Sequence, residues 1–187
     1  MRFDPDVHHR RSLRLEGYNY AQSGAYFITV CTQGRECLFG DIVNGEMRLN
    51  NLGNVVAESW RWLAIRHGYV ELDEWIVMPN HLHGILVIAN ECRGGSRTAP
   101  TMDAIKRKPL GRLIGAFKTL STNRINELRH TPAMPTWQRN YYERIIRNED
   151  ESSRIRTYIA ENPLKWEMDR ENPAAQVMKG PPEAWQV

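Results

Sequence analysis

Two neighbouring apolar segments, YVELDEWIVM (69–78) and HLHGILVIA (81–89), constrain the fold of this chain most strongly. Both are rich in the β-branched and aromatic residues that favour strands. The pair Pro79-Asn80 between them is typical of a turn, and a proline cannot donate a hydrogen bond within a central sheet. The sequence therefore predicts an antiparallel hairpin whose second strand carries two histidines, His81 and His83, among apolar residues.

The rest of the chain alternates between strand and helix patterns. Further strands are expected at 25–33, at 40–43 and 46–50 around the turn pair Asn44-Gly45, and within 137–147. Helices are expected from a cap near Asn51 to Gly68, over 110–128, and from a cap at Asn148 to Asn162, where Pro163 disfavours continuation. Hairpins interspersed with helices predict an α+β fold, a central antiparallel sheet with helices packed on it.

The length of 187 residues suits a single domain over 1–187. Residues 1–17 are expected to form a basic N-terminal arm, residues 90–109 a mobile loop, and residues 167–187 a polar tail. The chain has no apolar run of the roughly 20 residues that a membrane helix needs, and no apolar signal segment at its start. Its three cysteines show no metal or disulfide spacing. We therefore expect a cytoplasmic protein with reduced thiols and no membrane partner.

Basic residues are concentrated in one part of the chain. The formal net charge is only +3, but residues 101–130 hold seven lysines and arginines against two acidic residues. Such a cluster suits contacts to phosphates, and a solvated basic face is the alternative. The candidate DNA-binding residues are Lys106, Arg107, Lys108, Arg112 and Lys118, joined by Trp137, Arg139, Tyr142 and Arg144 for stacking on bases and holding phosphates.

The two histidines can act on one ion. Alternate residues of a strand share a face, so His81 and His83 lie about 7 Å apart at their Cα atoms. Imidazole is a common metal ligand, and two histidines leave positions open for a substrate. Tyr158 and Asn162, four residues apart, share a face of the last predicted helix. The alternatives are that the histidines only make structural hydrogen bonds, that Tyr158 packs in the core, and that Asn162 caps the helix.

Four segments together resemble a known family. MPNHLHGILV, GRLIGAFK, WQRNYYERIIRNEDE and YIAENP, in this order, are similar to the single-tyrosine HUH transposases, and particularly to the REP-associated tyrosine transposases. The resemblance covers residues 18–166, nearly the whole domain. It implies a ferredoxin-like sheet of the HUH type.

The resemblance also implies a function. It makes His81 and His83 metal ligands, Asn162 the third ligand and Tyr158 the catalytic nucleophile. The cofactor would be Mg²⁺ or Mn²⁺, and the partner single-stranded DNA with hairpin-forming repeats, cut and rejoined through a 5′-phosphotyrosine intermediate. The protein would act as a monomer or a homodimer.

Two other functions stay open from the sequence. One is a non-catalytic nucleic-acid-binding protein with the same fold, which the joint presence of His81, His83 and Tyr158 disfavours. The other is a hydrolytic zinc enzyme, which the lack of an acidic general base in the histidine motif disfavours.

Overall fold

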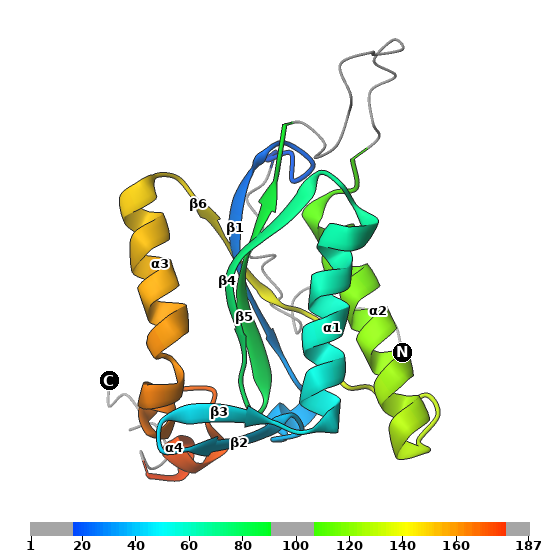
Figure 1. The fold of residues 1–187 in the computed structure, drawn as a ribbon, viewed down its shortest axis with the longest axis vertical. Coiled ribbons are helices and arrows are strands. Elements are labelled where there is room, and N and C mark those ends of the chain that lie inside the picture. The colour runs from blue at the N-terminus through cyan, green and yellow to red at the C-terminus, as the bar shows by residue number, and fades with distance from the viewer. Residues whose placement is uncertain (1–16, 91–106, 179–187) are drawn as a thin grey trace, which may run out of the picture.

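The computed structural model describes residues 17–90 and 107–178, and a four-stranded antiparallel sheet lies at its centre (Figure 1). The strand order is β4 (Val70–Val77), β5 (His81–Ile88), β1 (Gly24–Cys31) and β6 (Tyr142–Ile146), with every neighbouring pair antiparallel. The predicted hairpin of β4 and β5 is confirmed. Its turn at Pro79-Asn80 is closed by the hydrogen bond from Met78 N–H to the carbonyl of His81, 2.8 Å.

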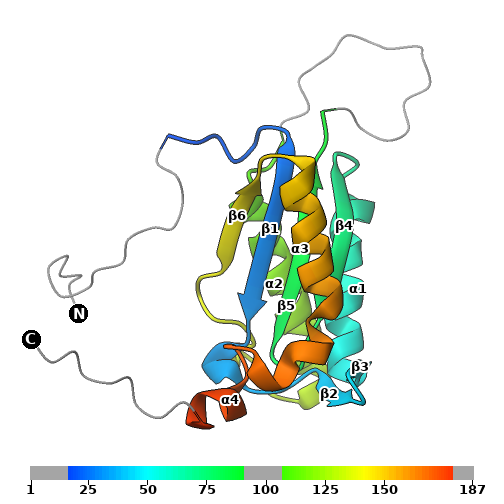
Figure 2. The ribbon, with the colours of Figure 1, turned by 90° about the vertical axis from the view of Figure 1, so that its left-hand side faces the viewer.

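Helices cover both faces of the sheet. α1 (Asn51–Arg66) and α2 (Leu110–Arg129) pack side by side on one face, and α3 (Glu149–Glu161) covers the other (Figures 1 and 2). The chain order β1, α1, β4, β5, α2, β6 is that of a ferredoxin-like fold. The predicted α+β class and antiparallel sheet are thus confirmed.

Asparagine side chains begin two of the helices. Asn148 Oδ1 accepts a hydrogen bond from the backbone N–H of Glu151 at 2.8 Å, and acidic residues fill the first turn of α3, as predicted. At α1 the cap is Asn50 rather than Asn51, because Asn50 Oδ1 accepts from the N–H groups of Leu52 and Gly53. That helix also ends at Arg66, before Gly68.

The alternation of side chains along β5 divides the core into two parts. Leu82, Leu86 and Ile88 join the large cluster under α1 and α2. Ile85 faces the other way and packs with Phe27 of β1 and Ile159 of α3. Because side chains two apart share a face, His81 and His83 lie on the same side of the sheet as Ile85, toward α3.

Shorter elements surround one end of the sheet. The hairpin of β2 (Gly40–Val43) and β3 (Glu46–Leu49) turns through Asn44 and Gly45 with φ of 54° and 76°, the left-handed geometry expected of an Asn-Gly turn. The 3₁₀ segments η1 (Gln33–Arg35) and η2 (Pro163–Met168) and the short helix α4 (Pro173–Met178) complete this end.

In the described part of the predicted tail, residues 167–178, Glu171 and Asn172 are buried and Pro173–Met178 form a short helix. Most of the predicted arm (1–16) and loop (91–106), and the last residues 179–187, lie outside the described residues. Within the described ranges, no helix is both long and apolar enough to cross a bilayer.

Candidate metal centre and tyrosine

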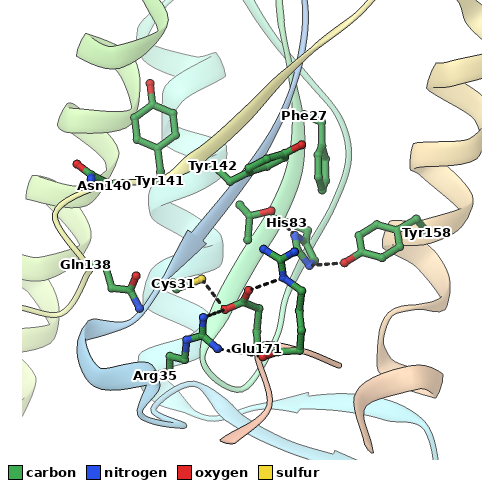
Figure 3. Close-up of a pocket in the computed structure, with 12 residues that line it drawn as sticks. Phe27, Cys31, Arg35, His83, Gln138, Asn140, Tyr141, Tyr142, Tyr158 and Glu171 are labelled. Carbon is green, nitrogen blue, oxygen red and sulfur yellow. Dashed lines mark hydrogen bonds and ion pairs between the residues drawn. The ribbon is translucent and has the colours of Figure 1, made fainter. Parts of the chain in front are cut away.

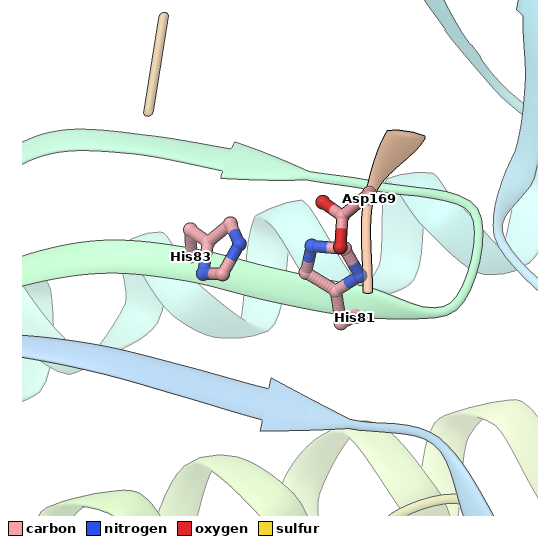
Figure 4. A group of neighbouring side chains, drawn as sticks. All are labelled: His81, His83 and Asp169. Atoms are coloured by element: carbon pink, nitrogen blue, oxygen red, sulfur yellow. The ribbon is translucent and has the colours of Figure 1, made fainter. Parts of the chain in front are cut away.

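Strand β5, a central strand of the sheet, carries the histidines as its first and third residues, beside the end of β1. His81 is opposite Cys31 and His83 is opposite Thr29 in the β1–β5 register. Their ring centroids are 4.4 Å apart, and both side chains are buried. The spacing predicted from the sequence therefore brings the two imidazoles together (Figure 4).

A buried asparagine sets the protonation of His81. Asn80 Nδ2 donates to the carbonyls of Arg35 (3.0 Å) and Glu171 (2.7 Å), so its Oδ1 is the atom that faces His81. That oxygen lies 2.8 Å from His81 Nδ1 and can only accept, so Nδ1 carries the proton. His81 Nε2 is then left with a free lone pair, the form that binds a metal ion.

His83 has a partner at each ring nitrogen. Nδ1 is 2.8 Å from Thr29 Oγ1, and Nε2 is 3.2 Å from the Tyr158 hydroxyl. If the phenol donates to Nε2, the imidazole proton sits on Nδ1 and is donated to Thr29. The contact brings the predicted nucleophile next to a predicted metal ligand.

Burial keeps both imidazoles neutral. It lowers the pKa of His81 to about 4, and the nearby negative charge of Glu171 only partly opposes this effect. Burial, followed by the charge of His81, holds the pKa of His83 well below its ordinary value. Both rings are therefore neutral at neutral pH, and each keeps one unprotonated nitrogen that can act as a metal ligand.

Two oxygens complete a donor set around the histidines. Asp169 offers a carboxylate oxygen that lies with the imidazole nitrogens in a group spanning at most 4.8 Å (Figure 4). Asn162, at the end of α3, is 2% exposed. Among the described residues, His81 Nε2 and Asn162 Oδ1 are buried without a hydrogen-bond partner. Buried polar atoms in this state cost about 1–3 kcal/mol each, a cost that a bound cation would remove.

The residues present fit a divalent metal ion. Imidazole nitrogens with amide and carboxylate oxygens suit Mn²⁺ and similar ions, and Mg²⁺ prefers the oxygens. Asp169 was not predicted from the sequence, because it lies in the segment predicted to be a tail. No signal in the sequence connects it to the histidine motif.

Tyr158 stands at the edge of this group. Its side chain is 43% exposed, and its ring contacts Phe27 edge to face at a centroid distance of 6.0 Å. Burial of the hydroxyl, the largest effect, and the negative charge of Asp169 raise the pKa of Tyr158, while the charge of Arg170 opposes them. The phenol is therefore protonated at neutral pH.

A cavity of about 410 Å³ opens beside Tyr158 and His83. Phe27 and Tyr142 border one end, and Arg35 and Glu171 the other (Figure 3). Cys31 also lines it and donates its S–H to Glu171 Oε2 at 3.4 Å. Burial raises the pKa of Cys31 to about 12, so this thiol is not a competing nucleophile at neutral pH.

The structure corrects one predicted DNA contact, Trp137, and gives another, Lys118, partners within the protein. Trp137 is buried in the core, where its Nε1–H donates to Ser121 Oγ at 2.9 Å, so its ring is not available to stack on a base. Lys118 Nζ donates to the carbonyls of Gln138 (2.9 Å) and Asn140 (3.0 Å). The strand predicted within 137–147 begins at Tyr142, and before it Trp137 pairs with Thr32 in an isolated bridge.

The other predicted DNA contacts are dispersed. Tyr142 lines the cavity, Arg139 is exposed in the segment before it, and Arg144 is exposed on β6, where its Nε is 2.6 Å from Glu151. Lys108 and Arg112 are exposed near the start of α2, in the layer across the sheet from Tyr158 (Figure 1). Arg107 donates to the carbonyl of Asn90, and Lys106 lies outside the described residues.

Several residues at the site carried no sequence signal. Asn80 and Thr29 position the histidines, and Arg35, Arg170 and Glu171 line the cavity. Asn80 is within the MPNHLH segment and could be suspected from its neighbours. The other four come from parts of the chain whose proximity only the fold determines.

Comparisons with known proteins agree with this architecture. An uncharacterized protein of Haemophilus influenzae is 39% identical over 175 residues, which cover 90% of this chain and 96% of that protein. The solved structure of a REP-associated tyrosine transposase bound to a REP hairpin superposes with a TM-score of 0.55 at 18% identity, covering 83% of this chain and 74% of that one. No family model matches the chain. The chain therefore belongs to one family with the Haemophilus influenzae protein, and it has the fold of the REP-associated tyrosine transposase.

Proposed function

We propose that this protein is a metal-dependent endonuclease and transesterase of single-stranded DNA that acts at hairpin-forming repeats. One observation carries the proposal: the hydroxyl of Tyr158 lies 3.2 Å from His83 Nε2, beside a buried cluster of metal-ligand atoms and at the wall of an open cavity. A nucleophile, a cation site and room for a phosphodiester thus occur together.

The reaction would exchange one phosphodiester for another. Tyr158 Oη attacks phosphorus, an Oη–P bond forms, and the bond from phosphorus to the 3′ oxygen breaks. The phenol proton is lost to water, which reaches the 43% exposed side chain, and the departing 3′ oxygen gains a proton. The product is a 5′-phosphotyrosine, and the reverse attack by a 3′ hydroxyl rejoins DNA without any further energy source.

His81, His83, Asn162 and Asp169 would hold the ion. A bound Mg²⁺ or Mn²⁺ would polarise the phosphate and offset the negative charge that develops on its oxygens. The protein's own residues supply the remainder. The rigid strand β5 fixes the ligands, and α3 fixes Tyr158 one helical turn from Asn162, so the nucleophile is held beside the phosphate.

The fold and the charge distribution support the proposed substrate. The REP-associated tyrosine transposase with this fold was solved with a REP hairpin, which supports a DNA hairpin as the partner. The basic residues Arg112, Arg139 and Arg144 are exposed and suited to the DNA backbone. Either a monomer or a homodimer accommodates the proposal.

A labelling experiment tests it. Hairpin oligonucleotides drawn from the DNA that flanks the coding region are incubated with the protein and Mn²⁺, and the products are separated on a denaturing gel. A 3′ label should move into the protein band, whereas a 5′ label should appear on a free fragment ending in a 3′ hydroxyl. Tyr158→Phe should abolish the adduct. Tyr20→Phe, which keeps a ring packed against Tyr18 and Tyr26, is the control and should keep it.

Other outcomes point to other functions. Cleavage that leaves no adduct and persists in Tyr158→Phe would support a hydrolytic metal enzyme, for which Asp169 offers a carboxylate near the histidines. DNA binding without cleavage under any divalent ion would support the non-catalytic reading. An adduct that survives Tyr158→Phe would remove this tyrosine as the nucleophile.

A further inference from the structure

A carboxylate holds two guanidinium groups at one end of the cavity. Glu171 Oε2 is 3.2 Å from Arg35 Nη2, and its Oε1 is 3.1 Å from Arg170 Nε. Arg35 Nη1 also donates to the carbonyl of Arg170 at 2.9 Å. The side chain of Glu171 is only 8% exposed, whereas those of Arg35 and Arg170 are 36% and 83% exposed. The group therefore presents a net positive charge to the cavity on a fixed support.

Aromatic and amide side chains form the other borders. Tyr142 is 40% exposed and meets Phe27 edge to face at a centroid distance of 6.2 Å. Gln138 and Asn140 line the side away from Tyr158 (Figure 3). Lys118 holds the backbone carbonyls of both residues, so this wall is braced from the core side.

We propose that this cavity binds the nucleotide whose 3′ oxygen departs when Tyr158 attacks. Arg35 and Arg170 would contact the phosphate attached to that oxygen, and Tyr142 would stack on the base. The orientation of this nucleotide in the cavity rests on the proposed function. An in-line attack places the departing oxygen opposite the nucleophile. Tyr158 forms one side of the cavity, so the departing nucleotide extends toward Gln138 and Asn140 on the other.

The chemistry of the lining matches that ligand. Guanidinium groups form paired hydrogen bonds with phosphate oxygens, and Glu171 orients both groups before the ligand arrives. An exposed tyrosine ring offers a stacking surface for any base, and the amides of Gln138 and Asn140 can hydrogen-bond to base edges. The volume of about 410 Å³ lies within the range of small-ligand sites.

Calorimetry with the full chain tests binding without any reaction. The probes are the four deoxynucleoside 3′-monophosphates, which carry the departing nucleotide and the attached phosphate, and inorganic phosphate. The nucleotides should bind more tightly than phosphate. Tyr142→Leu should weaken nucleotide binding by about five- to a hundredfold, the range expected for one stacked base. Arg170→Gln should weaken both nucleotide and phosphate binding.

Arg129→Gln is the matched control, because Arg129 is an exposed arginine in the last turn of α2, away from the cavity. It should leave binding unchanged. Both cavity residues are exposed, so their variants should fold, and circular dichroism checks this. Equal binding of phosphate and nucleotides, or unchanged binding in both cavity variants, would overturn the inference.

Cleavage kinetics separate this inference from the proposed function. Once the cut position is mapped, an abasic site on the 5′ side of the cut should lower kcat/KM in the wild type but have little further effect in Tyr142→Leu. Nucleotide binding without any adduct would refute the proposed function and leave the subsite standing. If an adduct forms but the abasic site lowers kcat/KM equally in the wild type and in Tyr142→Leu, the proposed function stands and the subsite is refuted.

Discussion

Replacing Asn80 by alanine tests the link between the β4–β5 turn and the candidate metal centre. Asn80 is fully buried, and its side chain makes three hydrogen bonds, to the carbonyls of Arg35 and Glu171 and to Nδ1 of His81. In Asn80→Ala all three partners lose their hydrogen bond. His81 is then free to place its proton on either ring nitrogen, and the tautomer with Nε2–H cannot bind a metal ion through that atom.

These contacts set the expected loss of both stability and metal affinity. At about 1 kcal/mol for each hydrogen bond, the free energy of unfolding should fall by about 3 kcal/mol. Loss of a hydrogen-bond partner behind a ligating histidine lowers metal affinity by roughly 10- to 100-fold. The variant should therefore be less stable and bind Mn²⁺ more weakly.

Urea unfolding and calorimetric titration with Mn²⁺ measure the two effects separately. Ser121→Ala is the control: it leaves the buried Nε1–H of Trp137 without its acceptor, on the α2 side of the sheet. It should cost about 1–3 kcal/mol of stability and leave Mn²⁺ affinity unchanged. If Asn80→Ala is destabilised but binds Mn²⁺ within about twofold of the wild type, Asn80 does not set the tautomer of His81.

Three further results are expected. Thr29→Val removes the partner of His83 Nδ1 with little change in shape, and Mn²⁺ affinity measured by calorimetry should fall about tenfold; equal affinity would contradict a role for this contact. In the metal-free protein, the pKa of His81 is about 6.5 in the unfolded chain and about 4 in the folded protein. The unfolded state therefore binds more protons between these values, so the free energy of unfolding should fall by on the order of 3 kcal/mol as pH drops from 6.5 to 4. His81→Gln should show a shallower pH dependence in urea unfolding, and an identical slope would refute the cause. Gly84→Ala would place a Cβ 2.9 Å from the ring of Trp60, so unfolding should require about 1–3 kcal/mol less; an unchanged midpoint would show that β5 shifts freely.

Local patterns predicted much of the fold. The β4–β5 hairpin and α3 with its Asn148 cap match the predicted elements closely, because turn chemistry and capping depend on residues near in sequence. The placement of His81 and His83 on one face follows from the two-residue period of a strand, which needs no tertiary information.

The wrong prediction, that Trp137 stacks on DNA, failed because of contacts distant in sequence. A tryptophan side chain can stack on a base, yet Trp137 packs against Phe39 and Phe117 in the core. The ammonium group of Lys118, a predicted DNA contact, also meets partners distant in sequence, the carbonyls of residues 138 and 140. In both cases a partner from another part of the chain determined where the side chain lies.

Local sequence patterns are enough to place two imidazoles on one strand, and Tyr158 on a helix with Asn162 at its end, because each spacing follows the repeat of its element. The surroundings of these side chains depend on how distant segments pack. Packing of α3 against the sheet brings the Tyr158 hydroxyl to His83, and the return of the chain after η2 brings Asp169 and Glu171 to the same end of the sheet. Side chains from segments this far apart share no periodicity, so their meeting depends on the burial of the two core clusters that join sheet and helices.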